Sequence, residues 1–318
     1  MIPKTSLKVL KHKALLDRLP QDHPQYRYIY DKWRQFESGQ AGEANLEYYL
    51  KQAHLDSPQF LNGLRIEHQS AFQIDWLLFD LGYRVILEIK NYTAPIYFDP
   101  HSRQLIRTKA GEKEVFPDPL LQVDLQHAQL PRFLDEHGIE QLPTFTAAVF
   151  VNRYAILELQ DYPDRHRILT AQALPSFLEK IARKHPAKIS PSRNQEIVSF
   201  LHDHHQEAHF PIMDRYGIKW SDLIKGVPCP ACTRFAMNRI RLRWQCPFCN
   251  ERSSDAYLPV LFDLALLSEN RITKRLAYDF LGGLSPDAAR KMMNRAGFIK
   301  VGTSKGAYYR HHDLVPFM

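Results

Sequence analysis

The chain has 318 residues, of which 44% are hydrophobic and 24% are charged, and this composition predicts a globular protein of two or three domains and excludes a disordered chain. The net charge is +7, but residues 1–218 carry 26 Lys and Arg against 27 Asp and Glu, whereas residues 219–318 carry 16 against 8. This basic C-terminal third indicates a polyanionic partner, most often nucleic acid. The alternative is that the basic surface only keeps the protein soluble.

Helices and strands alternate along the first 185 residues, which predicts an α/β layer architecture. A polar and aromatic helical stretch is expected over residues 1–36, and a new helix is expected from Ser38 to about Lys51. Strands are expected in a hairpin over 72–90, near 96–98, in a second hairpin over 105–115, at 145–151 and at 168–170, with helices at 119–137 and 174–184.

The hairpin over residues 72–90 places charges within an otherwise apolar segment. Leu81-Gly82 occupies the position of a two-residue turn, and counting outward from that turn puts Asp75 directly opposite Glu88. Because strand side chains alternate between faces, Glu88 and Lys90 share one face, and Val85, Leu87 and Ile89 point to the other. Such charges are costly unless a partner or a metal compensates them, so this face predicts chemistry.

These residue types fit the hydrolysis of a phosphodiester. That reaction needs an activated water and neutralised phosphate charge, and Mg²⁺ or Mn²⁺ held by carboxylates supplies both. Asp75 and Glu88 are the expected metal ligands, the Ile89 carbonyl could be a third, and Lys90 would orient the water or help to deprotonate it. Two side chains from neighbouring helices could complete the site, Glu43 near the metal and Gln122 near the water or phosphate.

Asp75, followed after twelve intervening residues by Glu88-Ile89-Lys90, resembles the pattern of the PD-(D/E)XK nuclease superfamily. Gly42-Glu43 before it and Pro119-Leu120-Leu121-Gln122 after it make residues 37–150 similar, more specifically, to the nuclease-related domain family. The resemblance implies a restriction-endonuclease-like mixed sheet flanked by helices and Mg²⁺-dependent cleavage of DNA. It also implies five active positions: Glu43, Asp75, Glu88, Lys90 and Gln122. Asp118 stands where this family has asparagine before proline, and it is not counted as a site residue.

All four cysteines lie in two C-x-x-C pairs separated by thirteen residues, Cys229 with Cys232 and Cys246 with Cys249. This spacing predicts one closed, structural Zn²⁺ site in a zinc ribbon, with an iron–sulfur cluster or a redox pair as minor alternatives. The segment between the pairs is expected to form a hairpin with three arginines on one face, which would contact phosphate or merely increase solubility. These are Arg239, Arg241 and Arg243.

The last 60 residues resemble a winged-helix module. A helix over 272–281 ends at two glycines, Ser285-Pro286 begins a second helix, and two short strands follow at 298–301 and 307–310. The second helix would enter the major groove and the wing would contact phosphate, with protein–protein docking as the alternative. The expected contacts are Arg290, Lys291, Asn294 and Arg295 on the helix and Lys305 on the wing.

We therefore expect a cytoplasmic, Mg²⁺-dependent deoxyribonuclease to which a zinc ribbon and a winged helix deliver DNA. No apolar run approaches the roughly 18 residues of a membrane span, and the first residues lack the apolar core of a signal peptide. RNA is an alternative substrate, paired cuts in a duplex would favour a homodimer, and the alternative function is a catalytically silent nuclease-like DNA-binding or adaptor protein. The expected segments are 1–36, a helical extension; 37–185, the nuclease-related domain; 186–225, a linker and helix; 226–254, the zinc ribbon; and 255–318, the winged helix.

Overall fold

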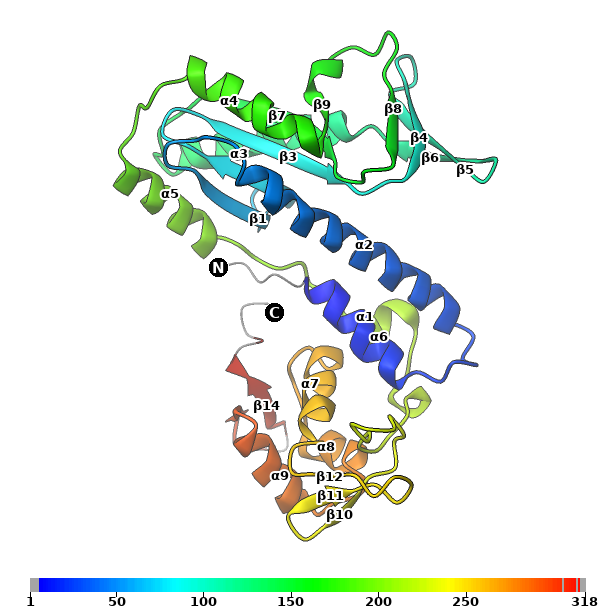
Figure 1. The fold of residues 1–318 in the computed structure, drawn as a ribbon. Helices are drawn as coiled ribbons and strands as arrows, with labels where there is room; N and C mark the ends of the chain where they lie inside the picture. Colours follow the sequence, from blue (N-terminus) through cyan, green and yellow to red (C-terminus); the bar gives the residue numbers. More distant parts are fainter. Residues whose placement is uncertain (1–5, 305, 313, 315–318) are drawn as a thin grey trace. The chain divides into compact units, whose positions relative to one another are not determined.

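The structure is a computed structural model that describes residues 6–304, 306–312 and 314, and the side chains of residues 43 and 44 are outside this description. The described chain forms two compact units (Figure 1). Among the described residues, unit 1 is built from residues 37–206, and unit 2 combines residues 6–36 with those from 207 onward. Within the described residues, every helix is too short or too polar to cross a lipid bilayer.

Unit 1 is organised around a mixed five-stranded sheet. Its strands are β1 (Gln59–Ile66), β2 (Phe72–Phe79), β3 (Arg84–Lys90), β7 (Thr144–Phe150) and β9 (Ile168–Thr170), and they lie in the order β1-β2-β3-β7-β9. β1, β2 and β3 are antiparallel neighbours, whereas β3, β7 and β9 are parallel neighbours. The predicted fold class, an α/β fold with a mixed sheet flanked by helices, is confirmed.

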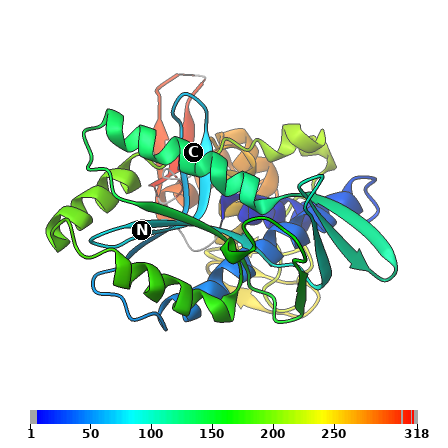
Figure 2. The same ribbon diagram turned by 90° about the horizontal axis from the view of Figure 1, so that it is seen from above.

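Helices cover both faces of this sheet, as Figure 2 shows for α3 and α4. The helices are α2 (Tyr26–Leu50), α3 (Pro119–Glu136), α4 (Leu174–Lys184) and α5 (Pro191–Asp203). Apolar residues of α3 and α5 pack with Ile74 and Ile86 on one face. Those of α4 and the second half of α2 pack with Val85 and Leu87 on the other. Because β3 is buried from both sides, its side chains have fixed surroundings, which suits a strand that carries a site.

A second sheet of four strands adjoins the end of β3. Its strands are β4 (Ala94–Asp99), β5 (Gln104–Lys109), β6 (Glu112–Pro117) and β8 (Ala155–Glu158), in the order β6-β5-β4-β8. β5 and β6 form the predicted hairpin, with Ala110 and Gly111 at positive φ in its turn. Ile96, Phe98 and Leu105 join the same core as α3, so this sheet extends unit 1.

The hairpin of β2 and β3 has the predicted register. Phe79 pairs with Arg84 and Trp76 pairs with Leu87, and the N–H of Asp80 donates to the Tyr83 carbonyl at 3.0 Å across the turn. The buried Asp80 carboxylate accepts a hydrogen bond from the N–H of Leu81 at 2.8 Å, which stabilises this turn. The turn chemistry therefore fixes which residues of the two strands face each other.

The segment after α4, expected to be a linker, packs against this hairpin turn. The N–H groups of Lys188 and Ile189 both donate to the Leu81 carbonyl, at 2.9 and 3.1 Å. Gly82 lies so close to the segment that a β-carbon there would be 2.2 Å from the Pro186 carbonyl oxygen. Only glycine fits in this position without moving one of the two backbones.

Unit 2 contains the first helices and the C-terminal third of the chain in one core. Apolar residues of α1 pack with those around the cysteines and with those of the last helices. The five segments expected from the sequence did not predict that the N-terminal helix and the C-terminal third share one core. The elements, besides the first part of α2, are α1 (Leu7–Arg18), α6 (Ile212–Tyr216), β10 (Asn238–Ile240), β11 (Arg243–Gln245), β12 (Arg252–Ser253), α7 (Leu258–Leu267), α8 (Lys274–Phe280), α9 (Pro286–Arg295), β13 (Phe298–Val301) and β14 (Tyr308–His311).

Arg18 links the parts of unit 2. Its side chain is fully buried, and its Nε donates to the Asp263 carboxylate of α7 at 2.9 Å while one Nη donates to the Ile224 carbonyl at 3.2 Å. Its guanidinium also lies over the rings of Phe235 and Phe280, 5.4 and 5.5 Å from their centroids. One residue of the N-terminal helix therefore contacts α7, α8 and the segment beside the cysteines.

Two elements differ from the sequence expectation. The helix expected to begin at Ser38 is the continuation of α2, which runs unbroken from Tyr26 to Leu50 through Gly39. β1 was not predicted as a strand, since its sequence includes Asn62 and Gly63, and Gly63 takes a positive φ of 65°. Pairing with β2 over seven residue pairs outweighs this weak local preference.

Substitution of Gly82 tests the packing of the hairpin turn. We expect Gly82→Ala to lower the free energy of unfolding by about 2 kcal/mol or more, because the added methyl group collides with backbone atoms. Gly39→Ala is the matched control, since its β-carbon would meet open space within α2, and it should be neutral or stabilise by about 0.5–1 kcal/mol. Urea unfolding of both variants measures the difference, and equal stability would contradict the close approach.

Candidate active site and metal centre

Three of the predicted site residues meet where the first half of β2 lies beside the end of β3. Glu88 is buried, with 2% of its surface exposed, and its Oε1 accepts a hydrogen bond from the Lys90 ammonium at 2.6 Å. Asp75 lies on β2 one residue beyond the last ladder pair, and its Oδ2 accepts from the backbone N–H of Ile89 at 2.9 Å. The two carboxylates and the lysine are therefore gathered as the hairpin register predicts.

α3 lies across this face and supplies the fourth residue. The exposed Gln122 accepts a hydrogen bond through its Oε1 from the Lys90 ammonium at 3.3 Å. Asp118, which departs from the family pattern, is the N-cap of this helix and accepts from the N–H of Leu120 at 2.8 Å. The same buried carboxylate pairs with Arg103 at 2.8 Å and accepts a hydrogen bond from the Tyr162 hydroxyl. Asp118 thus fixes where the helix begins and so where Gln122 lies.

Gln126 is a site residue that the sequence reasoning missed. Its amide nitrogen donates to the Glu88 Oε2 at 3.3 Å and to the Gln73 carbonyl at 2.8 Å. These two acceptors orient the amide, and its buried Oε1 has no hydrogen-bond partner among the described residues. The available signal was its spacing, because Gln122 and Gln126 are four residues apart and must share one face of α3.

The charge of Lys90 is set by its neighbours. Burial lowers the pKa of the Lys90 ammonium, but the attraction of Glu88 and Asp75 and the hydrogen bond to Glu88 outweigh this effect and raise the pKa above its usual value. Lys90 is therefore a stable cation beside Glu88, and it donates hydrogen bonds to both Glu88 and Gln122.

The donor set fits a Mg²⁺ ion that keeps several waters. Carboxylate oxygens from Asp75 and Glu88 are the hard ligands that Mg²⁺ prefers. The Oε1 of Gln126 adds a buried acceptor beside Glu88, which suits a bound water. The residues that would hold the ion are Asp75 and Glu88, with the Ile89 carbonyl as the predicted third ligand.

Glu43 lies in α2, but its side chain is outside the described part of the chain. The preceding residue, Gly42, locates this turn of the helix. A β-carbon at Gly42 would be 2.8 Å from the Asn91 β-carbon and 2.9 Å from a Val151 methyl group. Glycine therefore lets α2 approach the ends of β3 and β7 closely, next to Lys90, and the role of Glu43 stays a prediction.

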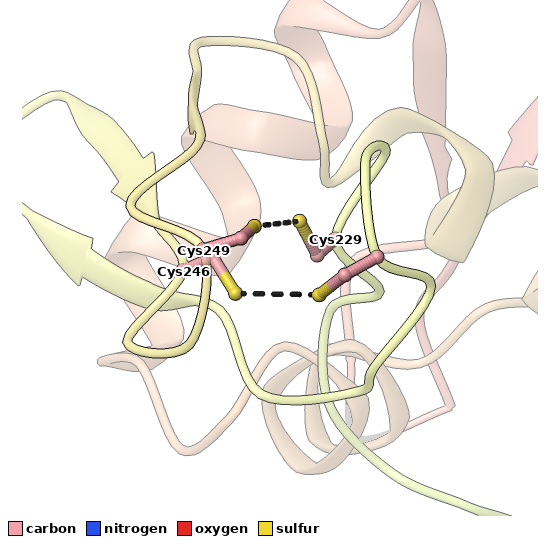
Figure 3. Close-up of side chains that lie close together, drawn as sticks. Cys229, Cys246 and Cys249 are labelled. Carbon is pink, nitrogen blue, oxygen red and sulfur yellow. Dashed lines mark hydrogen bonds between the residues drawn. The ribbon is translucent and has the colours of Figure 1, made fainter.

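The four cysteines form a compact cluster. Their sulfur atoms all lie within 4.8 Å of one another. The Sγ of Cys229 lies 3.5 Å from that of Cys249, and the Sγ of Cys232 lies 3.6 Å from that of Cys246. Figure 3 shows Cys229 facing Cys249. A tetrahedral Zn²⁺ with four thiolates at about 2.3 Å requires sulfur–sulfur distances of this order. The donor set therefore fits zinc, and the three-stranded sheet β10-β11-β12 beside it is consistent with a zinc ribbon.

The prediction that three arginines share one face of this hairpin is wrong. Arg239 pairs with Trp244 and Ile240 pairs with Arg243, so Arg239 and Arg243 lie on opposite faces of β10 and β11. Arg241 lies in the turn at a positive φ of 56°. The turn after Ile240 interrupts the alternation that the prediction extended through it, and Arg239 instead donates to the sulfur of Met292 on α9 at 3.2 Å.

α9 has the predicted polar face. Lys291, Asn294 and Arg295 are exposed, whereas Arg290 is half-buried and lies 3.5 Å from Asp287. The buried residues of this helix, Ala289, Met292 and Met293, point into the core of unit 2. The two predicted strands are present as β13 and β14, and Ile272 forms a bridge to Tyr309 that adds a third short segment. Lys305 lies outside the described residues.

A mixed sheet between helices, with an aspartate and a Glu-X-Lys sequence on neighbouring strands, defines unit 1 as a nuclease-like α/β domain. Residues 38–151 match the family model of the nuclease-related domain. This part of the chain is therefore a nuclease-related domain, and its expected partner is nucleic acid. No curated protein and no solved structure matches the chain.

Removing the zinc ligands tests the metal centre. We expect the purified protein to contain stoichiometric zinc and Cys232→Ser to lose it, because three thiolates bind less tightly than four. Cys229, Cys246 and Trp244 belong to the core of unit 2, so the loss should also unfold that unit. Elemental analysis measures the zinc content. Tryptophan fluorescence measures the unfolding of unit 2, since Trp33, Trp220 and Trp244 lie in that unit. Ser254→Ala is the exposed neighbouring control, and retention of zinc by Cys232→Ser would contradict the assignment.

Proposed function

We propose that this protein is a metal-dependent deoxyribonuclease of the PD-(D/E)XK type. The observation that carries the proposal is the buried Glu88, which is hydrogen-bonded to Lys90 and Gln126 beside Asp75 on the neighbouring strand. A buried carboxylate and a cation gathered on one strand are costly to maintain for stability alone. Their position in a nuclease-related domain supports a role in phosphodiester hydrolysis.

In this proposal, Asp75, Glu88 and the Ile89 carbonyl hold Mg²⁺, and Glu43 supports the metal from α2. When bound, the ion would neutralise charge on the phosphate and activate a water. Lys90 keeps its ammonium near the reacting phosphate, where it can orient the water and stabilise developing negative charge. Gln122 accepts a hydrogen bond from Lys90, which leaves its amide nitrogen available to hold a phosphate oxygen or the water.

We further propose that the C-terminal third delivers DNA. The order α7, the Ile272 segment, α8, α9, β13 and β14 supports a winged helix, in which α9 would enter the major groove. The exposed face of α9 and the net charge of +8 over residues 219–318 support contact with phosphate. Arg239, Arg241, Arg243, Arg290 and Lys305 remain predicted contacts.

Replacement of Glu88 tests the catalytic proposal. With Mg²⁺ or Mn²⁺, we expect the protein to cleave linear or circular DNA, and Glu88→Gln and Lys90→Met should each lose about a hundredfold or more in rate. Glu112→Gln on β6 is the matched control, because it removes the same charge from an exposed position of unit 1. Cleavage is followed on a gel with a chelator control.

If Glu88→Gln cleaves as fast as the wild-type protein, the assigned site is wrong. If neither protein cleaves any substrate with any metal while both bind DNA, the alternative applies, namely a catalytically silent nuclease-like protein that binds DNA or recruits a partner.

The salt dependence of DNA binding tests the role of α9. We expect Lys291→Ala/Arg295→Ala to weaken duplex binding and to reduce the slope of log K against log salt by about 0.9 for each phosphate that the variant no longer neutralises. Lys13→Ala/Arg27→Ala is the matched control, since it removes two exposed cations from α1 and α2. Fluorescence anisotropy at several salt concentrations measures the slope, and equal slopes for the two variants would contradict a phosphate-binding role.

A further inference from the structure

A pocket lies at the carboxyl ends of β3 and β7, and the proposed chemistry does not use it. It has a volume of about 420 Å³ and is formed by residues of α2 and by the residues that follow β3 and β7. β3 and β7 are parallel, so their carboxyl ends lie at the same end of the sheet, and ligands of parallel sheets commonly bind at that end. Asn91 lines the pocket and directly follows Lys90 in the chain, so a strand that passes the end of β3 can reach both residues.

Among the side chains that the structure describes, the walls combine aromatic rings with one cation and no acidic group. Tyr48 and Tyr154 are 63% and 62% exposed, so both rings are accessible to a ligand. Tyr48 stands edge-on against Tyr49, with ring centroids 5.2 Å apart. The guanidinium of Arg153 lies over the ring of Tyr154 at 4.6 Å, so one face of that ring is already covered by a cation. These are the side chains that hold stacked bases and their phosphates.

Hydrogen bonds connect three lining residues of this pocket, Asn91, Asn152 and Tyr154, to one another and to α2. The amide nitrogen of Asn91 donates to the Ser38 carbonyl at 2.8 Å, and the amide nitrogen of Asn152 donates to the Asn91 side-chain oxygen at 3.0 Å. The Asn152 oxygen in turn accepts from the backbone N–H of Tyr154 at 3.0 Å. This chain joins α2 to the ends of β3 and β7, so Tyr154 has a fixed backbone position relative to the end of β3.

We propose that this pocket binds an unpaired nucleotide of the nucleic-acid strand next to the phosphate that reaches Lys90. The bases in a duplex are stacked and paired, so only an unpaired or extruded base can lie on the tyrosine rings. The substrate of the site therefore offers an unpaired base, in a single strand, a frayed end or a flap, or as a base extruded from a duplex. This inference rests on the proposed nuclease function for its biological meaning, but binding in the pocket does not require cleavage.

Binding without magnesium tests the pocket. In magnesium-free buffer, we expect Tyr48→Ala/Tyr154→Ala to lose about tenfold or more in affinity for a fluorescein-labelled oligothymidine, because one stacking contact is worth about that factor. The affinity of this variant for the oligothymidine–oligoadenine duplex should equal that of the wild-type protein. Tyr48→Phe/Tyr154→Phe should bind as the wild-type protein does, since the rings remain. Tyr97→Ala, which removes an exposed tyrosine of β4, should also have no effect.

Photocrosslinking locates the strand independently of affinity. An oligothymidine with one 5-iodouracil should crosslink to peptides that contain Tyr48 or Tyr154, and the alanine variant should lose these crosslinks. Unchanged single-strand affinity in that variant, or crosslinks found only in unit 2, would overturn the proposal. Because both rings are exposed, the variants should keep the circular dichroism spectrum of the wild-type protein.

The two proposals fail separately. Cleavage that depends on Glu88, together with unchanged single-strand binding by the alanine variant, would overturn the pocket alone. Strand binding that depends on the tyrosines, in a protein that cleaves nothing, would support the pocket and overturn the nuclease proposal.

Discussion

Glu88 places a carboxylate inside the main sheet, where an ionised group is costly unless donors surround it. The Lys90 ammonium and the Gln126 amide occupy one oxygen each, and these contacts require β3 and α3 to lie in fixed positions. Removing one partner of such a buried pair costs about 3–5 kcal/mol in general, so the arrangement constrains the surrounding residues. Asp118 determines where α3 begins, and Gly42 lets α2 approach the end of β3. The candidate site is thus the point on which the packing of three elements depends.

Unit 2 depends on contacts of a different kind. The buried Arg18 of α1 reaches α7, α8 and the segment beside the cysteines, so the N-terminal helix is part of the same core as the C-terminal third. The cysteine cluster contributes two buried thiols to this core. A zinc ion there would stabilise more than a small ribbon, because Trp244 and Met237 connect the cluster to the helices through apolar packing.

Local patterns predicted much of unit 1, and they failed where long-range contacts decide. The turn at Leu81-Gly82 gave the correct register of β2 and β3, since a two-residue turn leaves few alternatives. The same alternation rule failed for Arg239 and Arg243, because the position of the turn after Ile240 could not be read from the residues. β1 was missed because pairing with β2, rather than its own residues, makes it a strand. Gln126 was missed because the orientation of α3 over Glu88 is a tertiary property.

The sequence by itself determined the α/β character of the first part of the chain, the register that brings Asp75 to Glu88, the zinc-ligand spacing and the basic C-terminal third. These follow from side-chain period, turn chemistry and charge, which act over a few residues. Only the tertiary structure decided that α1 shares a core with residues 207 onward, that Gln126 completes the contacts of Glu88, and that Tyr48 and Tyr154 line one pocket. Those facts depend on residues far apart in the chain, whose contacts are selected by the packing of whole helices against sheets rather than by any local pattern.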